Sequence, residues 1–213
     1  MRIRTLLNPF NCLQRYEKQL WEKIFPHFDG TLDVEVGFGT GSFLESYAKA
    51  HPTRAIVGFE IRRQLVEAAQ ERITQLGLEN IHLVLGNCQL GLEDMFEDKS
   101  IDRLFIFHPD PWPKRQHHKR RVLNTQFLEL IHQKLKLGHC LYLATDVPEL
   151  WEAMLATIEE TKKFAHITDD PFWTTLYHTR WRTYSLERNR SLFYGTFQAL
   201  QSADDNEGSL PIE

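Results

Sequence analysis

The sequence predicts an α/β fold in which a mostly parallel sheet is covered by helices on both faces. Short apolar segments alternate with segments of helical periodicity along most of the chain, as in parallel sheets built with crossover helices. The strand segments are almost continuously apolar, as expected for strands buried on both sides. The first strand ends in three alternating glycines, Gly37, Gly39 and Gly41, at the point where doubly wound sheets bind ligands.

The expected elements follow one another in a regular order. An amphipathic helix is expected over 12–28, where apolar residues recur at helical spacing. The organisation is therefore an N-terminal helical segment over 1–30, an α/β domain over 31–200 and a short acidic tail over 201–213. Strands are expected at 31–36, 54–60, 81–85, 101–107 and 139–144, with late strands at 164–168 and 192–199. Helices are expected at 42–50, 62–76, 124–136 and 148–163.

The composition excludes several classes of protein. The chain has 213 residues, with 25 Lys and Arg against 29 Asp and Glu, and the tail, which we expect to be disordered, is acidic. No apolar run approaches the ~20 residues of a membrane span, and the N-terminus lacks the apolar core of a signal peptide. The three cysteines are widely spaced and form no disulfide or metal-ligand pattern, which favours a reducing, cytoplasmic setting.

The glycine loop is the first candidate site. Glu35 lies just before it, Glu60 ends the second strand, and Asn87 follows the third. A carboxylate at the end of the second strand suits the two hydroxyls of a ribose, so a dinucleotide and S-adenosylmethionine are both considered. The spacing departs from the Gly-x-Gly-x-x-Gly of dinucleotide sites, and the acid at Glu35 suits a ligand that carries a sulfonium and an ammonium. S-adenosylmethionine is therefore preferred. Asn87 is placed to touch an adenine edge, or is a turn residue.

The second candidate site is the loop after the fourth strand, His-Pro-Asp-Pro-Trp-Pro-Lys at 108–114. Its three prolines stiffen the backbone around Asp110 and Trp112, beside the expected cofactor. A dense basic run follows, and a flat aromatic beside such a run is typical of a nucleic-acid surface; the alternative is a solvated charged loop. The pair His117 and His118 does not indicate a metal, because adjacent histidines do not converge on one ion within a regular element.

Taken together, these motifs resemble one family. Glu-Val-Gly-Phe-Gly-Thr-Gly, Val-Gly-Phe-Glu, Pro-Asp-Pro-Trp-Pro-Lys, His-His-Lys-Arg-Arg and Ala-Thr-Asp are similar to motifs of the bacterial tRNA (guanine-N7)-methyltransferase family, from about residue 31 to 190. The resemblance implies a Rossmann-like class I methyltransferase fold, with a seven-stranded sheet and one antiparallel strand near its edge. It also implies transfer of a methyl group from S-adenosylmethionine to N7 of a guanine in the variable loop of tRNA, conventionally position 46.

The resemblance also assigns roles to individual residues. Contacts with S-adenosylmethionine are implied for Glu35, Gly37, Gly39, Gly41, Glu60, Asn87 and Asp110. Contacts with the target nucleotide are implied for Lys114, Asp146, Thr183 and Glu187, and contacts with RNA for Gln116, His117, His118, Lys119, Arg120 and Arg121. The sequence departs from the family at Asn87, where Asp is usual. It departs again at 183–187, where Thr-Tyr-Ser-Leu-Glu is one residue longer than the family's Thr-x-x-Glu.

Asp110 is the expected catalytic residue. N7 of guanine has an in-plane lone pair and no proton, so its methylation depends on orientation rather than on a base. Asp110 would position the purine and stabilise the charge that develops on it. Asp146 would accept hydrogen bonds from the guanine, or is an acid at a helix N-terminus.

Three other functions stay open at this point. They are methylation of an exocyclic base nitrogen, tRNA binding without methyl transfer and, less favoured, NAD-dependent oxidoreduction. The expected partner is tRNA, with no membrane and no metal, and the chain is either a monomer or a homodimer.

Overall fold

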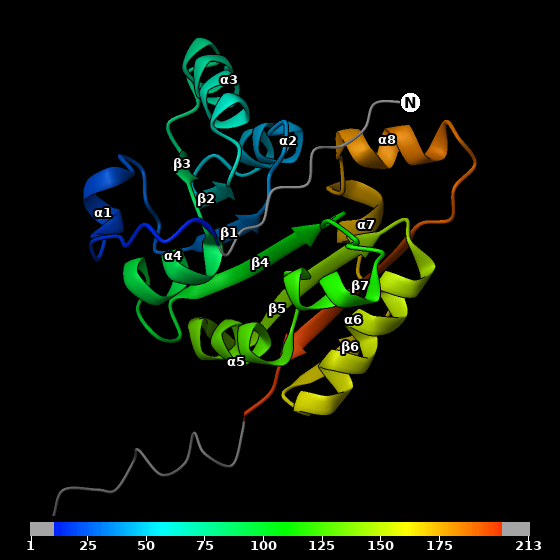
Figure 1. Cartoon of the computed structure of the whole chain (residues 1–213). Helices are drawn as coiled ribbons and strands as arrows, with labels where there is room; N and C mark the ends of the chain where they lie inside the picture. Colours follow the sequence, from blue (N-terminus) through cyan, green and yellow to red (C-terminus); the bar gives the residue numbers. More distant parts are fainter. Residues whose placement is uncertain (1–10, 202–213) are drawn as a thin grey trace, which may run out of the picture.

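A seven-stranded sheet forms the centre of the computed structural model, which describes residues 11–201 (Figure 1). The strands are β1 (Leu32–Val36), β2 (Ala55–Glu60), β3 (Ile81–Leu85), β4 (Ile101–Phe107), β5 (Leu135–Thr145), β6 (Phe164–Ile167) and β7 (Phe193–Ala199). Their order is β3-β2-β1-β4-β5-β7-β6, and β7 runs antiparallel to both of its neighbours. The fold class predicted from the sequence is confirmed, including the antiparallel strand next to the edge.

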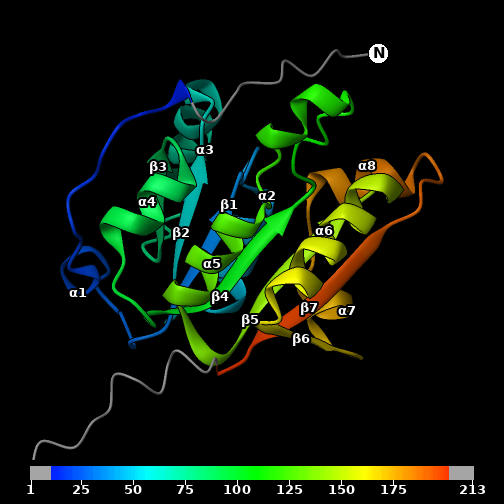
Figure 2. The ribbon, with the colours of Figure 1, turned by 60° about the horizontal axis from the view of Figure 1, so that its bottom comes forward.

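Helices cover both faces of this sheet (Figure 2). The helices are α1 (Trp21–Ile24), α2 (Ser42–Ala50), α3 (Arg63–Gln75), α4 (Cys88–Met95), α5 (Thr125–Lys134), α6 (Pro148–Thr161), α7 (Phe172–Thr175) and α8 (Arg180–Leu186), with a 3-10 helix η2 (Arg115–Arg120). α4, α5 and α6 pack on one face against the larger apolar core, and α2, α3 and α7 pack on the other against an aromatic core. None of the helices within residues 11–201 combines the length and the apolar character that a bilayer span requires.

The sheet has its switch point between β1 and β4. β1 pairs in parallel with β2 on one side and with β4 on the other, so the chain winds outward in both directions from this pair. In such sheets the crevice at the carboxyl ends of the two central strands is the usual ligand site. The glycine loop leaves β1 and the Pro-Asp-Pro loop leaves β4, so the fold brings both candidate sites to one edge.

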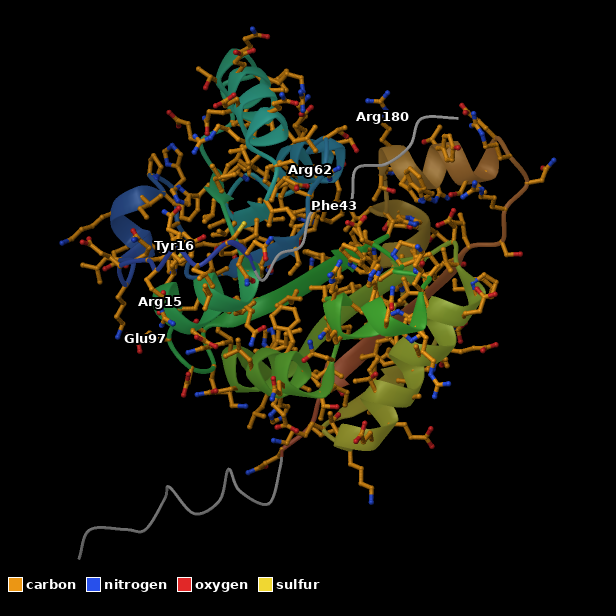
Figure 3. All side chains as sticks on the ribbon, viewed as in Figure 1. Arg15, Tyr16, Phe43, Arg62, Glu97 and Arg180 are labelled. Carbon is orange, nitrogen blue, oxygen red and sulfur yellow. The ribbon has the colours of Figure 1, made fainter. Side chains whose placement is uncertain are left out.

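The prediction of a helix over 12–28 is wrong for most of these residues. Only Trp21–Ile24 is helical, and the described residues before it run as an irregular strap beside α4 (Figure 3). The backbone N–H of Tyr16 donates to Asp94 at 2.9 Å and its hydroxyl to the Leu85 carbonyl at 3.2 Å. These bonds hold the strap against the body. Leu13 is 76% exposed, so the apolar residues that recur at helical spacing over 12–28 do not form one buried helix face.

Other differences are smaller. The sequence analysis did not predict α4, α7, α8 or η2, which are short and lack a clear apolar period. β5 begins directly at the end of α5, several residues before the expected strand. The acidic tail over 201–213 lies almost wholly outside the described residues, so its expected disorder stays a prediction.

Candidate functional site

A pocket that is partly open to solvent lies at the switch point. Its walls come from the ends of four parallel strands and from the loop after β4. The lining residues include Val36, Gly37, Phe59, Glu60, Arg62, Asn87, His108, Asp110, Trp112, Arg120 and Phe127. The fold therefore gathers Gly37 of the glycine loop, the acid that ends β2, the Asn87 position and Asp110 around one space, whereas Gly39 and Gly41 do not line it.

The backbone conformation of the loop after β1 requires glycine at three positions. Gly37, Gly39 and Gly41 have φ values of +72°, +59° and +78°, which side chains rarely adopt. A Cβ at Gly37 would meet no atom within 4 Å, so this position faces open space. The Phe59 carbonyl accepts from the Gly37 and Phe38 amides at 2.7 and 3.1 Å. The loop is thus fixed to β2 and leaves room for a ligand to approach its backbone.

Glu60 fastens this loop to the end of β2. Its carboxylate accepts from the Gly39 amide at 3.0 Å and from the Ile61 and Arg62 amides at 2.9 and 3.0 Å. The Arg62 guanidinium adds two more bonds, of 3.0 and 2.9 Å. The hydrogen bond to Glu60, together with the charges of Glu60 and Asp110, raises the pKa of Arg62. Arg62, which the sequence analysis missed, therefore lies close to both carboxylates of the pocket.

Glu35 is buried behind the loop and does not line the pocket. Its side chain is 3% exposed, and its Oε2 atom has no hydrogen-bond partner among residues 11–201. Burial, followed by the charge of Glu60, raises the pKa of Glu35 well above its usual range. Burial of an ionised carboxylate that accepts no hydrogen bond destabilises the folded protein. A cationic group of a ligand would supply the missing hydrogen-bond donor.

Asn87 has a structural role in the protein. Its Oδ1 accepts from the Gln89 amide at 2.9 Å, so it is the N-cap of α4. It also lines the pocket, with 8% of its surface exposed. Asn87 therefore caps a helix rather than forming a turn, and its contact with a ligand stays a prediction.

The loop after β4 is built on an unusual backbone. His108 and Trp112 have φ values of +48° and +43°, and prolines flank Asp110 on both sides. Trp112 is only 5% exposed, and the Arg120 guanidinium lies over its ring at 5.1 Å. The indole therefore lies beside the basic run and lines the pocket together with Asp110, and its role at an RNA surface stays a prediction.

The basic run forms η2, and most of its cations are exposed. Lys114, Arg115 and Lys119 reach solvent, whereas Arg120 is half-buried on Trp112. Arg121 has a different role, since its Nε donates to the Pro111 carbonyl at 3.0 Å. It therefore holds the loop closed. Among residues 11–201 no cluster of three potential metal ligands occurs, at His117 and His118 or elsewhere.

Asp146 follows β5, and its side chain is 4% exposed. It accepts from Trp181 Nε1 at 3.0 Å, Ser185 Oγ at 3.1 Å and Arg190 Nη1 at 2.8 Å, and His108 Nδ1 lies at 3.7 Å. Burial alone would raise the pKa of Asp146, but the surrounding donors outweigh it and hold the pKa well below its usual range. Asp146 does not cap α6, whose N-cap is Val147. It ties α8 to the sheet.

The other three expected substrate residues, like Asp146, do not line the pocket. Thr183 is exposed on α8, and its hydroxyl lies 3.4 Å from the Thr179 carbonyl. Glu187, the C-cap of α8, is 66% exposed and pairs with Arg188 at 3.8 Å. Lys114 is exposed at the start of η2. None of these three side chains contributes to the pocket that Glu60, Asn87 and Asp110 line.

His108 is a further residue that the sequence analysis did not single out. It is buried at 4% exposure, its Nε2 lies 2.6 Å from the Tyr177 hydroxyl, and its ring lines the pocket. Its place at the start of the loop was the only available signal, because its partners Tyr177 and Asp146 lie far along the chain.

The parallel sheet with its switch-point pocket, the glycine loop after β1 and the two acids beside that loop together define the class I methyltransferase fold. Solved structures agree with this class. The 16S rRNA methyltransferase KamB superposes with a TM-score of 0.62 over 88% of this chain and 96% of its own, at 16% identity. A structure described as an antibiotic-related methyltransferase has a TM-score of 0.62 over 91% and 99% of the two chains, also at 16% identity. At these identities the likeness concerns the fold alone.

Sequence relatives are more specific. The model of a family described as "Putative methyltransferase" matches residues 29–191. A tRNA (guanine-N(7)-)-methyltransferase of Marinobacter nauticus is 32% identical over 172 residues, which cover 81% of this chain and 72% of that protein. A Synechococcus protein of the same name is 32% identical over 76% of this chain and 69% of its own. The chain belongs to the tRNA (guanine-N7)-methyltransferase family, as its motifs predicted.

Proposed function

We propose that this protein transfers a methyl group from S-adenosylmethionine to N7 of a guanine in the variable loop of tRNA. One observation carries the proposal: a single pocket gathers the glycine loop, Glu60, Asn87 and Asp110, with the basic helix η2 at its rim. The names of the relatives supply the substrate class. With tRNA as substrate, we also propose that the protein works in the cytoplasm.

The residues present fit S-adenosylmethionine, which would supply a methyl group activated on a sulfonium. Gly37 faces open space and allows close approach of a ligand to the backbone. Glu35 lies outside the pocket lining, but its Oε2 has no donor among the described residues, so it is suited to the cofactor's ammonium where the cofactor reaches behind the loop. Glu60 is suited to the ribose hydroxyls, although the Arg62 guanidinium now bonds both of its oxygens. Cofactor binding therefore requires Arg62 to share or release Glu60.

Asp110 is proposed to position the guanine rather than to remove a proton. N7 carries no proton, so the reaction needs the base held in line with the methyl group. The flanking prolines and the fixed turn at Trp112 limit the motion of Asp110. A carboxylate held there stabilises positive charge as it develops on the purine ring. Arg62, close to Asp110, balances this carboxylate before the substrate enters.

Asp146 is proposed to act on the substrate site through α8. Its oxygens already accept from Trp181, Ser185 and Arg190, so contact with a guanine would require it to exchange one of these donors. Thr183 and Glu187 lie on the exposed side of the helix that Asp146 holds, and we propose that they approach the tRNA from there. Lys114 and the exposed cations of η2 would contact phosphates, which fixes position rather than sequence.

The test uses the full chain with methyl-labelled S-adenosylmethionine and bulk tRNA that lacks modifications, followed by nucleoside mapping. Label in 7-methylguanosine is expected. Label on an exocyclic nitrogen would replace the proposal with the alternative base methylation. Cofactor and tRNA binding without any labelled nucleoside would instead identify a tRNA-binding protein that has lost transfer activity.

A further inference from the structure

A second basic surface lies at the same edge of the sheet as η2. Helix α8 and the turn after it carry Arg180, Arg182, Arg188 and Arg190, and within 171–192 the only acid is Glu187. Arg190 is committed to Asp146, whereas Arg188 forms only a long, exposed pair with Glu187 at 3.8 Å, so three guanidinium groups of this segment remain for a ligand. Figure 3 shows the Arg180 side chain pointing away from the body of the protein. We call Arg180, Arg182 and Arg188 the α8 arginines.

This segment is fixed beside the pocket at both of its ends. The Arg180 amide donates to Ser42 Oγ at 3.0 Å, and Ser42 is the first residue after the glycine loop. Further along, Trp181 and Ser185 donate to Asp146 at the end of β5. The segment therefore borders the carboxyl edge of the sheet from the glycine loop to β5. Its place does not depend on a mobile linker.

The two basic elements lie on opposite sides of that edge. η2 leads into α5, and Arg120 and Phe127 line the pocket on the face covered by α4, α5 and α6. α8 follows Tyr177, which belongs to the aromatic core on the face covered by α2, α3 and α7. In Figure 2 both elements lie beyond the tip of β4, with α8 in orange and η2 in green. A strand of RNA that delivers a base to the pocket would meet cations on both flanks.

The α8 arginines suit a phosphate backbone. The Arg188 guanidinium lies 3.7 Å from the centre of the Tyr184 ring, and that of Arg182 lies 5.6 Å from the Tyr177 ring. A guanidinium held over an aromatic ring has less freedom to move, and its N–H groups remain suited to two phosphate oxygens. Three positive charges held in a fixed arrangement match the regularly spaced phosphates of a nucleic acid. An acidic protein surface fits less well, because its charges are not regularly spaced.

We infer that the α8 arginines form the second wall of the tRNA site and bind phosphates on the flank opposite η2. This inference rests on the proposed function, because it takes tRNA as the occupant. It adds three arginines that flank the Thr-Tyr-Ser-Leu-Glu segment at 183–187 and to which the sequence analysis gave no role. It also gives Asp146 a purpose, since Asp146 anchors the helix that carries these arginines.

The test compares the triple variant R180Q/R182Q/R188Q with the control K23Q/K49Q/K162Q, which removes three exposed cations from α1, the end of α2 and the end of α6. Binding of an unmodified tRNA transcript is measured over a range of salt concentrations, with S-adenosylmethionine binding and thermal melting as checks on folding. The slope of log affinity against log salt should flatten by about 0.7–0.9 for each lost phosphate contact, so by about two to three units in the arginine variant. The control should keep the wild-type slope.

Two further variants separate loss of charge from loss of folding. R180K/R182K/R188K retains the charges and should keep most of the slope, and R180Q alone removes one outward-pointing side chain if the triple variant does not fold. A wild-type slope in the glutamine variants, from an enzyme that still makes 7-methylguanosine, overturns this inference and leaves the proposed function standing. A wild-type protein that neither binds nor methylates tRNA overturns the proposed function itself.

Discussion

Substitution of Glu35 by Gln tests the idea that the protein buries a carboxylate for the sake of a cationic ligand. Burial and the nearby Glu60 raise the pKa of Glu35 in the folded protein above its value in the unfolded chain. A group of this kind contributes stability that is present below the unfolded pKa and is lost as the pH rises through the folded pKa. Without ligand, the wild-type protein should therefore lose stability with rising pH, and Glu35→Gln should not show that part of the loss.

The magnitude follows from proton linkage. Between the unfolded and folded pKa values, one group changes the free energy of unfolding by up to about 1.4 kcal/mol per pH unit. For a chain of this size, 1 kcal/mol shifts the melting temperature by about 2–4 °C, so the melting-temperature advantage of Glu35→Gln should grow by up to roughly 3–6 °C per pH unit. The control is Glu152→Gln, which removes an exposed carboxylate from α6 and should melt in parallel with the wild type.

The affinity for S-adenosylmethionine should depend on pH in the opposite sense to the stability of the free protein. Pairing with the cofactor's ammonium requires ionised Glu35, so wild-type affinity for S-adenosylmethionine should rise with pH over the same window. Glu35→Gln should bind more weakly at neutral pH by about 1.5–3 kcal/mol, the scale of a hydrogen bond to a charged group. Thermal melts and calorimetry from pH 5 to 9 measure both effects. Parallel melting curves for wild type and Glu35→Gln, with equal cofactor affinity, would refute the reasoning.

Three other substitutions test neighbouring parts of the site. Asp110→Asn should lower single-turnover methyl transfer by about 10²–10³-fold without creating a new pH dependence; a carboxyl titration in the wild-type rate that vanishes in this variant would identify a base instead. Lys119→Ala should flatten the salt slope of tRNA binding by about 0.7–0.9, whereas Arg121→Ala should lower the melting temperature because it loses the bond to the loop; equal effects would contradict this division. Gly86→Ala should destabilise the protein by about 1–3 kcal/mol, because the backbone has φ +144° and the new Cβ would lie 1.8 Å from the Tyr16 hydroxyl; partial recovery in a double variant with Tyr16→Phe is the check, by thermal melting.

The sequence by itself determined the fold class and one of the two walls of the site. Apolar strands alternate with helices, and this local pattern is sufficient because each strand of a parallel sheet is buried on both faces. Gly37 follows β1, Glu60 ends β2 and Asp110 follows β4, and the carboxyl ends of parallel strands share an edge. Their meeting around one pocket was therefore predictable from order along the chain.

The tertiary structure decided what depends on partners that are distant in sequence. The segment before Trp21 has helical periodicity, yet hydrogen bonds from Tyr16 to Asp94 and Leu85 hold it as a strap. Asp146 is an isolated acid in the sequence and becomes the anchor of α8 only because Trp181 and Arg190 return to the end of β5. A side chain's hydrogen bonds depend on which segments the fold brings beside it, and no local pattern encodes that. The bidentate contact of Arg62 with Glu60 and the second basic wall on α8 appear only in the folded protein for the same reason.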